Sequence, residues 1–315
     1  MPRNSSDARD IRAEYRHIRR PVRGWVFSVK LAVVGMLTAS AAALIHLGTI
    51  WSLPLGIIVM GLTFAHAVEL QHEALHSIGF RNPRANVVAG VILGLPMLTS
   101  FAAYRASHMR HHRDLGTPGN REFFDYGDQY GSENVSRPRR LLSWLYRFSM
   151  IAHYGQFFVV LAKLVSGAPL EGEKPATVRA IRRDYAIMAL LLVLGTAGSL
   201  AFHSLFLVWT WLVPLLLIAS PAHAAIELPE HYRCDTDTTD PLRNTRTIRS
   251  NRLMAWYTNG NNFHVEHHLM PNLPIAQLGE LHQAMEGRPK YYHRTYRDFF
   301  RSLRATASQH TGEQG

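Results

Sequence analysis

The sequence has little cysteine and, over long stretches, no charge. Cys234 is the single cysteine among 315 residues, which excludes an intrachain disulfide and a thiolate metal cluster and fits a reducing compartment. Residues 31–68, 85–104 and 185–226 contain no Asp, Glu, Lys or Arg. All 34 basic and 23 acidic residues therefore lie in the remainder of the chain. The mean hydropathy of −0.07 is thus an average over uncharged apolar segments and strongly charged segments. This composition excludes disorder and disfavours a purely soluble domain.

The two longer uncharged segments predict membrane-spanning helices. A bilayer core about 30 Å thick needs roughly 20 apolar residues of helix, and segments 31–68 and 185–226 are each long enough to cross it twice. Polar breaks near residues 46–54 and 202–204 divide each segment into a hairpin. We therefore expect an all-α integral membrane protein with four transmembrane helices in two hairpins, at about 28–48, 53–71, 185–202 and 205–226.

The distribution of basic residues predicts the orientation of these helices. Residues 1–30 contain eight Lys and Arg residues and residues 105–184 contain thirteen, whereas neither hairpin turn contains any. By the positive-inside rule, both termini and the central segment face the cytoplasm, in the cell inner membrane if the source is bacterial. Anionic lipid head groups, and not nucleic acid, then explain the net charge of +11. We expect a basic cytoplasmic segment over 1–30, a membrane domain over 31–281 and a cytoplasmic tail over 282–315.

Histidines are concentrated in three pentapeptides. Eight of the 18 histidines lie in His72-Glu73-Ala74-Leu75-His76, His108-Met109-Arg110-His111-His112 and His264-Val265-Glu266-His267-His268. Residues three and four apart share one face of a helix, so each of these histidine boxes can chelate a metal ion. Eight imidazoles exceed the four ligands of one tetrahedral zinc but suit two metal ions of higher coordination number. The spacing therefore predicts a dinuclear site.

The boxes can form one site only if they lie on one side of the membrane. The first box follows the second predicted span and the third box follows the fourth, so both are expected in the cytoplasm. A fifth span at residues 85–104 would place the second box on the other side. Gly90 and Gly94 have the spacing of close helix packing and precede Pro96, so we interpret this segment as a re-entrant or interfacial helix. The histidines then lie in a cytoplasmic helical cap that holds the dimetal site.

Between about Leu31 and Leu281, the order of hairpin, H-E-x-x-H, H-x-x-H-H, second hairpin and H-V-E-H-H-L-M-P resembles the membrane fatty acid desaturase and hydroxylase superfamily. The flanks Tyr104-Arg105-Ala106-Ser107-His108 with Gly116-Thr117, and Glu230-His231-Tyr232 with Arg243-Asn244-Thr245-Arg246-Thr247, are similar to those of bacterial acyl desaturases. The resemblance implies two iron ions in a non-haem diiron centre, O2 as co-substrate, and removal of hydrogens from an unactivated alkyl chain.

The resemblance also implies ligands outside the boxes. Family members supply a further histidine near the cytoplasmic end of the last span, where His231 lies, and Glu227 is placed where a weak or water-mediated ligand would fall. The metal and catalytic set then consists of His72, His76, His108, His111, His112, His231, His264, His267 and His268, with Glu227 as a further metal ligand. Carboxylates often orient metal-bound imidazoles; the candidates, each of which also fits a solvated surface charge, are Asp114, Glu122, Asp125, Asp128 and Asp237.

Other functions would give a role to only some of the histidines in the three boxes. His72-Glu73-x-x-His76 also matches a zinc metalloprotease signature, in which the glutamate is the general base, but an intramembrane protease would give the other two boxes no role. A channel, transporter or anchor would leave all three unexplained. Hydroxylation or ketolation of a lipid or carotenoid needs the same centre, and the boxes do not distinguish it from desaturation. The flanks favour O2-dependent desaturation of a fatty acyl chain.

The electron supply is expected to come from another protein. The sequence has no G-x-G-x-x-G dinucleotide fingerprint, no C-x-x-C-H haem attachment site and too few cysteines for an iron–sulfur cluster. We therefore predict a separate donor, a ferredoxin or a b-type cytochrome with its reductase, which binds the basic cytoplasmic face through charge attraction.

Overall fold

The computed structural model describes residues 6–120 and 137–303, and these are mostly helical, which confirms the predicted all-α membrane fold. The chain divides into two compact units. We call residues 22–110 and 131–225 the span unit, and residues 1–21, 111–130 and 226–315 the C-terminal unit. The boundaries fall inside two helices, because α5 and α9 each begin in the span unit and end in the C-terminal unit.

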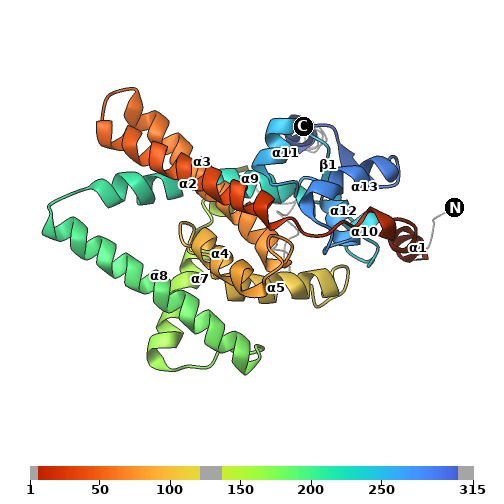
Figure 1. Ribbon diagram of the computed structural model, residues 1–315, viewed down its shortest axis with the longest axis horizontal. Helices are drawn as coiled ribbons and strands as arrows, with labels where there is room; N and C mark the ends of the chain where they lie inside the picture. Colours follow the sequence, from red (N-terminus) through yellow and green to blue (C-terminus); the bar gives the residue numbers. More distant parts are fainter. Residues whose placement is uncertain (1–5, 121–136, 304–315) are drawn as a thin grey trace. The chain divides into compact units, whose positions relative to one another are not determined.

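The span unit contains the long helices of the chain (Figure 1). Its elements are α2 (Gly24–Leu47), α3 (Ser52–Leu75), α4 (Pro83–Gly94), most of α5 (Phe101–Asp114), α6 (Arg137–Phe148), α7 (Ile151–Ser166), α8 (Pro175–Ala201), the π-helical turns η2 (Val208–Leu212) and η3 (Leu215–Ala219), and most of α9 (Ser220–Glu227).

Four helices in the described residues are long and apolar enough to cross a membrane: Gly24–Leu47, Ser52–Leu75, Pro175–Ala201 and Val208–Glu230. Each predicted span falls on one of them. The hydropathy pattern missed the polar helix ends, because backbone hydrogen bonds continue the third helix through charged residues before Tyr185 and the second past residue 71. Pro138–Phe148 and Ile151–Ser166 meet the same test only as a pair bent by 55°, which would make five.

Helix α3 is the central helix of the span unit. In its most apolar window 61% of residues are buried, compared with 11% in α2 and 17% in α8. Helices α2 and α3 lie side by side (Figure 1), and a Cβ at Gly56 would come 2.7 Å from the Ile45 side chain. A Cβ at Gly61 would come 2.4 Å from Ile218. Close packing of small residues thus surrounds the helix that ends at the first histidine box.

The segment 85–104 is not one continuous helix. Helix α4 ends at Gly94 and α5 begins at Phe101, with the break at the predicted proline. A Cβ at Gly90 would lie 2.1 Å from the Phe101 ring, and a Cβ at Gly94 would lie 2.1 Å from the Thr99 carbonyl oxygen. The two glycines therefore permit the chain to fold back tightly, as their spacing indicated. The re-entrant placement of this segment in a membrane stays a prediction.

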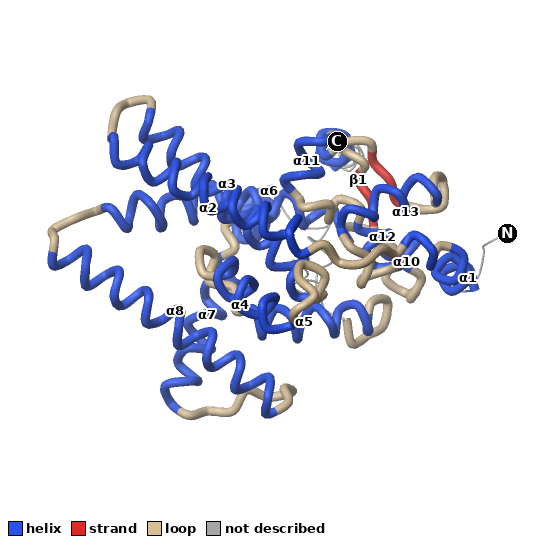
Figure 2. Tube along the Cα trace, viewed as in Figure 1, coloured by secondary structure: helices blue, strands red, loops and turns tan. Residues whose placement is uncertain are grey.

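The C-terminal unit consists of short elements. These are α1 (Ser6–Glu14), η1 (Arg16–Ile18), η4 (Leu228–Glu230), α10 (Pro241–Asn244), β1 (Arg246–Ile248), α11 (Arg252–Tyr257), α12 (His264–Leu269), η5 (Ile275–Gln277), α13 (Leu278–Ala284) and β2 (Tyr291–His293). Strands β1 and β2 pair in parallel, with Thr247 opposite Tyr292 (Figure 2). Three residues are too few to show the alternation that predicts a strand, so no sequence pattern indicated this pair. The predicted domain boundaries stay predictions.

Candidate metal centre

Three of the predicted ligands meet within the span unit. His72 lies in the last turn of α3, His76 directly follows that helix, and His108 belongs to α5. The Nε2 atom of His108 is 2.8 Å from that of His72 and 3.0 Å from that of His76. Three ring nitrogens that converge in this way cannot all be satisfied by hydrogen bonds to one another, because a neutral imidazole has one donor and one acceptor. Such a group of ring nitrogens could hold a metal ion.

The end of α3 is hydrogen-bonded to α4 and to the turn that precedes α5. The buried amide of Gln71 donates from Nε2 to the carbonyl oxygens of Gly90, at 2.8 Å, and of Thr99, at 3.1 Å. Gln71 directly precedes His72, so these two hydrogen bonds connect the first histidine box to the segment that leads into the second.

The start of α5 is capped by a carboxylate from another helix. Asp184 of α8 is 1% exposed, and its Oδ2 atom accepts from the Ser100 hydroxyl at 3.0 Å and from the Ala102 backbone N–H at 2.9 Å. The Ser100 hydroxyl in turn accepts from the Ala103 N–H at 3.1 Å. Initial N–H groups of a helix have no partner within the helix and carry partial positive charge. The cap therefore holds the N-terminus of the helix that carries the second box.

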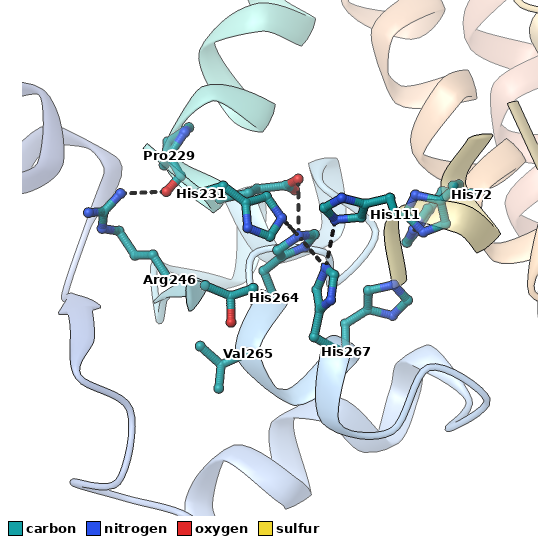
Figure 3. Close-up of polar contacts among 12 residues, drawn as sticks. His72, His111, Pro229, His231, Arg246, His264, Val265 and His267 are labelled. Carbon is teal, nitrogen blue, oxygen red and sulfur yellow. Dashed lines mark hydrogen bonds and ion pairs between the residues drawn. The ribbon is translucent and has the colours of Figure 1, made fainter. Parts of the chain in front are cut away.

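Four predicted ligands gather in the C-terminal unit: His111, His231, His264 and His268, whose ligand atoms all lie within 4.8 Å of one another. The Nε2 atoms of successive pairs are separated by 3.0 Å for His231 and His264, 3.1 Å for His264 and His268, and 3.2 Å for His268 and His111 (Figure 3). In the same unit the Nε2 atoms of His112 and His267 are 3.0 Å apart. All nine predicted histidines therefore direct a ring nitrogen toward another predicted ligand.

Two of these imidazoles are oriented by neutral oxygen atoms. His231 Nδ1 is 3.0 Å from the Asn244 carbonyl oxygen, and His111 Nδ1 is 3.1 Å from Asn120 Oδ1. Because each oxygen accepts from Nδ1–H, the Nε2 atom keeps the lone pair that binds a metal. The backbone before His231 is also held, because the buried Arg246 donates from Nη1 to the Pro229 carbonyl oxygen at 2.6 Å (Figure 3).

The surroundings of His268 favour a neutral imidazole. Burial holds the pKa of His268 well below its ordinary value, and the surrounding imidazoles of His112, His264, His111 and His231 lower that pKa further. A neutral imidazole is the form that binds a metal ion, so no proton has to leave His268 at neutral pH.

Two of the carboxylates proposed as orienting partners, Asp114 and Asp237, lie in the described residues, and their role toward the imidazoles stays a prediction. Asp114 pairs with the neighbouring Arg113, with 2.7 Å between Nε and Oδ1, and Asp237 is exposed. Glu122, Asp125 and Asp128 lie outside the described residues. Sequence reasoning missed Asn120 and Asn244, because a carbonyl or amide oxygen leaves no distinctive residue pattern.

Two glutamates lie at the end of the fourth candidate span. Glu230 is close to the four-histidine group, with Oε2 3.4 Å from His264 Nε2, although the sequence identified it only as a flanking residue. Glu227 ends α9 and is not a member of that group among the described residues. Its role as a metal ligand therefore stays a prediction.

Three histidines outside the predicted set lie close to oxygen atoms of the protein. His153 lies 2.9 Å from the Met97 carbonyl oxygen through Nε2, and His282 lies 2.7 Å from Glu266 through Nδ1. His223 is buried in the span unit, 3.6 Å from the carboxylate of Glu69. His310 lies outside the described residues.

Comparison with known proteins gives a family match that includes all nine predicted histidine ligands. The sequence profile described as "Fatty acid desaturase" matches residues 48–300, which include all three histidine boxes and His231.

Several curated proteins are similar at low identity. Dihydrorhizobitoxine desaturase of Bradyrhizobium elkanii is 24% identical over 253 residues, which cover 76% of this chain and 70% of that protein. A chloroplastic omega-3 fatty acid desaturase of Brassica napus is 24% identical over 152 residues, or 48% of this chain and 37% of that protein. Delta(8)-fatty-acid desaturase of Euglena gracilis is 22% identical over 268 residues, or 78% of this chain and 63% of that protein.

Proposed function

Because the chain belongs to the fatty acid desaturase family, we propose that it uses O2 to introduce a carbon–carbon double bond into a fatty acyl chain at a histidine-ligated diiron centre. The observation that carries this proposal is that imidazoles converge within each unit, three in the span unit and six in the C-terminal unit. Helix α5 contributes His108 in the span unit and His111 and His112 in the C-terminal unit, so one helix supplies predicted ligands to each unit.

The donor set fits two iron ions better than one zinc ion. For a metal–nitrogen bond of about 2.1 Å, neighbouring ligands are about 3.0 Å apart in an octahedron and about 3.4 Å apart in a tetrahedron. The separations of 2.8–3.2 Å between ring nitrogens are short enough for neighbouring imidazoles to bind one ion. Imidazole accepts iron readily, and nine imidazoles leave coordination positions open on two six-coordinate ions. Iron bound there would supply the activation of O2.

The protein's own residues would orient the metal and the substrate. Asn120 and Asn244 hold two of the ring tautomers, and exposed apolar side chains of α8, such as Leu190 and Val193, suit contact with lipid. Conversion of –CH2–CH2– to –CH=CH– with reduction of O2 to two water molecules consumes two electrons and two protons from outside the substrate. A lipid-soluble acyl chain and an electron donor are therefore both required.

A zinc protease is disfavoured by the position of Glu73. In that mechanism the glutamate between the first-box histidines must act as a base toward water. Here the Glu73 carboxylate forms an ion pair with Lys30 of α2, with 2.7 Å between Nζ and Oε2, and both side chains are largely buried. The carboxylate is thus held by a cation from α2, whereas the protease mechanism requires it to face the attacking water.

Lipid or carotenoid hydroxylation and ketolation remain the alternative within the superfamily. Hydroxylation and desaturation both begin with removal of one hydrogen from the alkyl chain. In hydroxylation oxygen is then added to that carbon, whereas in desaturation a hydrogen is removed from the neighbouring carbon. The desaturase names of the similar proteins favour the olefin.

The proposed electron donor is a separate ferredoxin or b-type cytochrome with its reductase. A donor with an acidic surface would be attracted by the net charge of +11, so its association should weaken as salt rises. Salt-independent reduction of the purified protein would contradict this proposal.

The deciding experiment combines metal analysis with lipid mass spectrometry of a host that expresses the full chain. We expect two iron ions per chain and a new olefin in the acyl lipids. His111→Ala should lose turnover and bound iron, whereas His46→Ala, at the end of α2, should keep both. One zinc and no iron per chain, or full activity in His111→Ala, would contradict the centre; an alcohol without an olefin would contradict desaturation.

A further inference from the structure

The acidic residue inside the third histidine box is buried and held from two sides. Glu266 of α12 has no exposed surface. Its Oε2 atom accepts from the Thr247 hydroxyl at 2.6 Å, and its Oε1 atom accepts from His282 Nδ1 at 2.7 Å. Thr247 belongs to β1 and His282 to α13, so one carboxylate connects three elements of the C-terminal unit.

Helical geometry places Glu266 behind the imidazoles of the same box. Successive residues of a helix are rotated by about 100°, so His264 and His268 lie on one face and Glu266, two residues from each, lies on the opposite face. The Nε2 atoms of His264 and His268 are 3.1 Å apart on the front of the helix. Glu266 therefore holds the back of the helix that presents the ligands.

The orientation of α12 depends on such external contacts. The helix has six residues, and a helix this short is not stable by itself. The Thr247 hydroxyl also accepts from the Val265 backbone N–H at 3.1 Å. His282 stacks on Tyr292 of β2 with an interplanar angle of 14°. The contacts to Glu266 thus come from side chains that are themselves fixed.

We propose that Thr247, Glu266 and His282 are positioning residues that set the rotation of α12 and thereby aim its three imidazoles at the metal. This inference rests on the proposed function, because it takes His264, His267 and His268 as iron ligands. Loss of one connection would turn all three imidazoles together. Loss of outer partners of metal ligands typically weakens metal binding 10–100-fold, and a similar loss is expected here.

The test is anaerobic titration of the metal-free full-length protein in detergent with Fe(II). Thr247→Val keeps the shape of the side chain and removes the hydroxyl, whereas Thr247→Ser keeps the hydroxyl. We expect about 10-fold weaker binding or more for Thr247→Val and Glu266→Ala, and a change of no more than about twofold for Thr247→Ser.

A second pair tests the other side of the carboxylate. His282→Asn retains an N–H near the position of Nδ1 and should bind Fe(II) nearly as the unchanged protein does, whereas His282→Ala should not. Glu280→Ala, on the same helix but exposed and paired with Arg20, is the matched control and should have no effect. In the Glu266→Ala background, His282→Ala should weaken binding little further, because both changes break one connection.

The thermal midpoint of each metal-free variant separates positioning from general stability. A lower midpoint with unchanged Fe(II) affinity in Thr247→Val, Glu266→Ala and His282→Ala would overturn the inference. If the first two fail to fold, the His282→Asn and His282→Ala pair decides it, and equal affinity in that pair would overturn it. Absence of Fe(II) binding by the unchanged protein would instead contradict the proposed function.

Discussion

Gly116, in the turn directly after the second histidine box, has no room for a side chain. Its φ is +78°, and a Cβ would lie 1.7 Å from the Thr238 carbonyl oxygen within the same unit. Both the left-handed backbone and the close approach therefore require glycine. The sequence identified Gly116-Thr117 as a flank of the box without indicating why it was there.

We predict that Gly116→Ala lowers stability by about 1–3 kcal/mol, because backbone strain and overpacking each cost energy of this order. The thermal midpoint of the detergent-solubilised protein measures the change. Gly119→Ala is the control, since its Cβ would have no neighbour closer than 3.7 Å. Equal midpoints for the two variants would show that the loop can move away.

Asp235 makes the C-terminal unit sensitive to acid. Burial by itself raises the pKa of Asp235, but hydrogen bonds from Lys290, Tyr291 and Arg243 outweigh it and hold that pKa below its ordinary value. The Asp235 carboxylate lies 2.6 Å from Lys290 Nζ and 2.7 Å from Arg243 Nη2. A folded-state pKa below the unfolded value of about 4 stabilises the fold above that pH, and the contribution is lost as pH falls through the folded-state pKa.

We therefore predict that Asp235→Asn lowers the thermal midpoint at pH 7 and weakens its further fall below about pH 4, where the unchanged protein loses the ionised carboxylate. Asp237→Asn, which replaces an exposed neighbour, should leave the pH profile unchanged. A profile of Asp235→Asn parallel to that of the unchanged protein would refute the assignment.

The histidines were predictable as candidate ligands because helix geometry fixes which side chains share a face. The spacings predicted that each box presents imidazoles to a shared site, whereas the structure distributes the second box, with His108 beside His72 and His111 beside His268. Their partners were not predictable in the same way. Asn120 reaches its ring from a loop and Asn244 from the end of the four-residue helix α10. The path of such short segments depends on packing far from these residues in sequence. Glu230 was visible only as a flank.

At the scale of elements, helix α5 depends on a carboxylate that belongs to α8. Asp184 supplies the acceptor that the first N–H groups of α5 need, together with Ser100. No local sequence pattern around α5 predicts this cap, because Asp184 lies within the long charged-to-apolar helix α8. The uncharged segments predicted the helices themselves, whereas this contact between them required the structure.

We predict that Asp184→Ala lowers stability by about 1–3 kcal/mol, because the buried Ser100 hydroxyl and the Ala102 N–H lose their acceptor. Hydrogen exchange at the first turn of α5 should accelerate, with Asp184→Asn intermediate because its amide oxygen can still accept. Arg182→Ala replaces an exposed residue two positions earlier and serves as the control. Unchanged exchange at Ala102 and Ala103 in Asp184→Ala would argue against the cap.

At the scale of the whole molecule, composition predicted the fold class well. Uncharged runs predicted four apolar helices, and four helices of suitable length are present in the described residues. The paired strands β1 and β2 were not foreseen, because pairing between residues 246–248 and 291–293 is a non-local choice. The orientation of the chain across the membrane is still a prediction from the basic residues.

Single cysteines test that orientation. In a Cys234→Ala background, Ile50→Cys and Phe202→Cys place thiols at exposed hairpin turns, at residues that are 80% and 81% exposed. A membrane-impermeant maleimide added to intact cells should label both, since the turns are predicted outside the cytoplasm. Arg252→Cys, on the exposed side of α11, should be labelled only after lysis. Labelling at residue 252 in intact cells would reverse the topology.

The pairing of β1 with β2 also has a consequence for truncated variants of the gene. Strand β2 comes after the last histidine box and contributes Tyr292, on which His282 stacks. A stop codon between the third box and Tyr291 would leave every predicted ligand in the product. Such a product would lack the strand against which β1 pairs. A count of intact histidine boxes is therefore not sufficient evidence that a gene variant encodes a working protein.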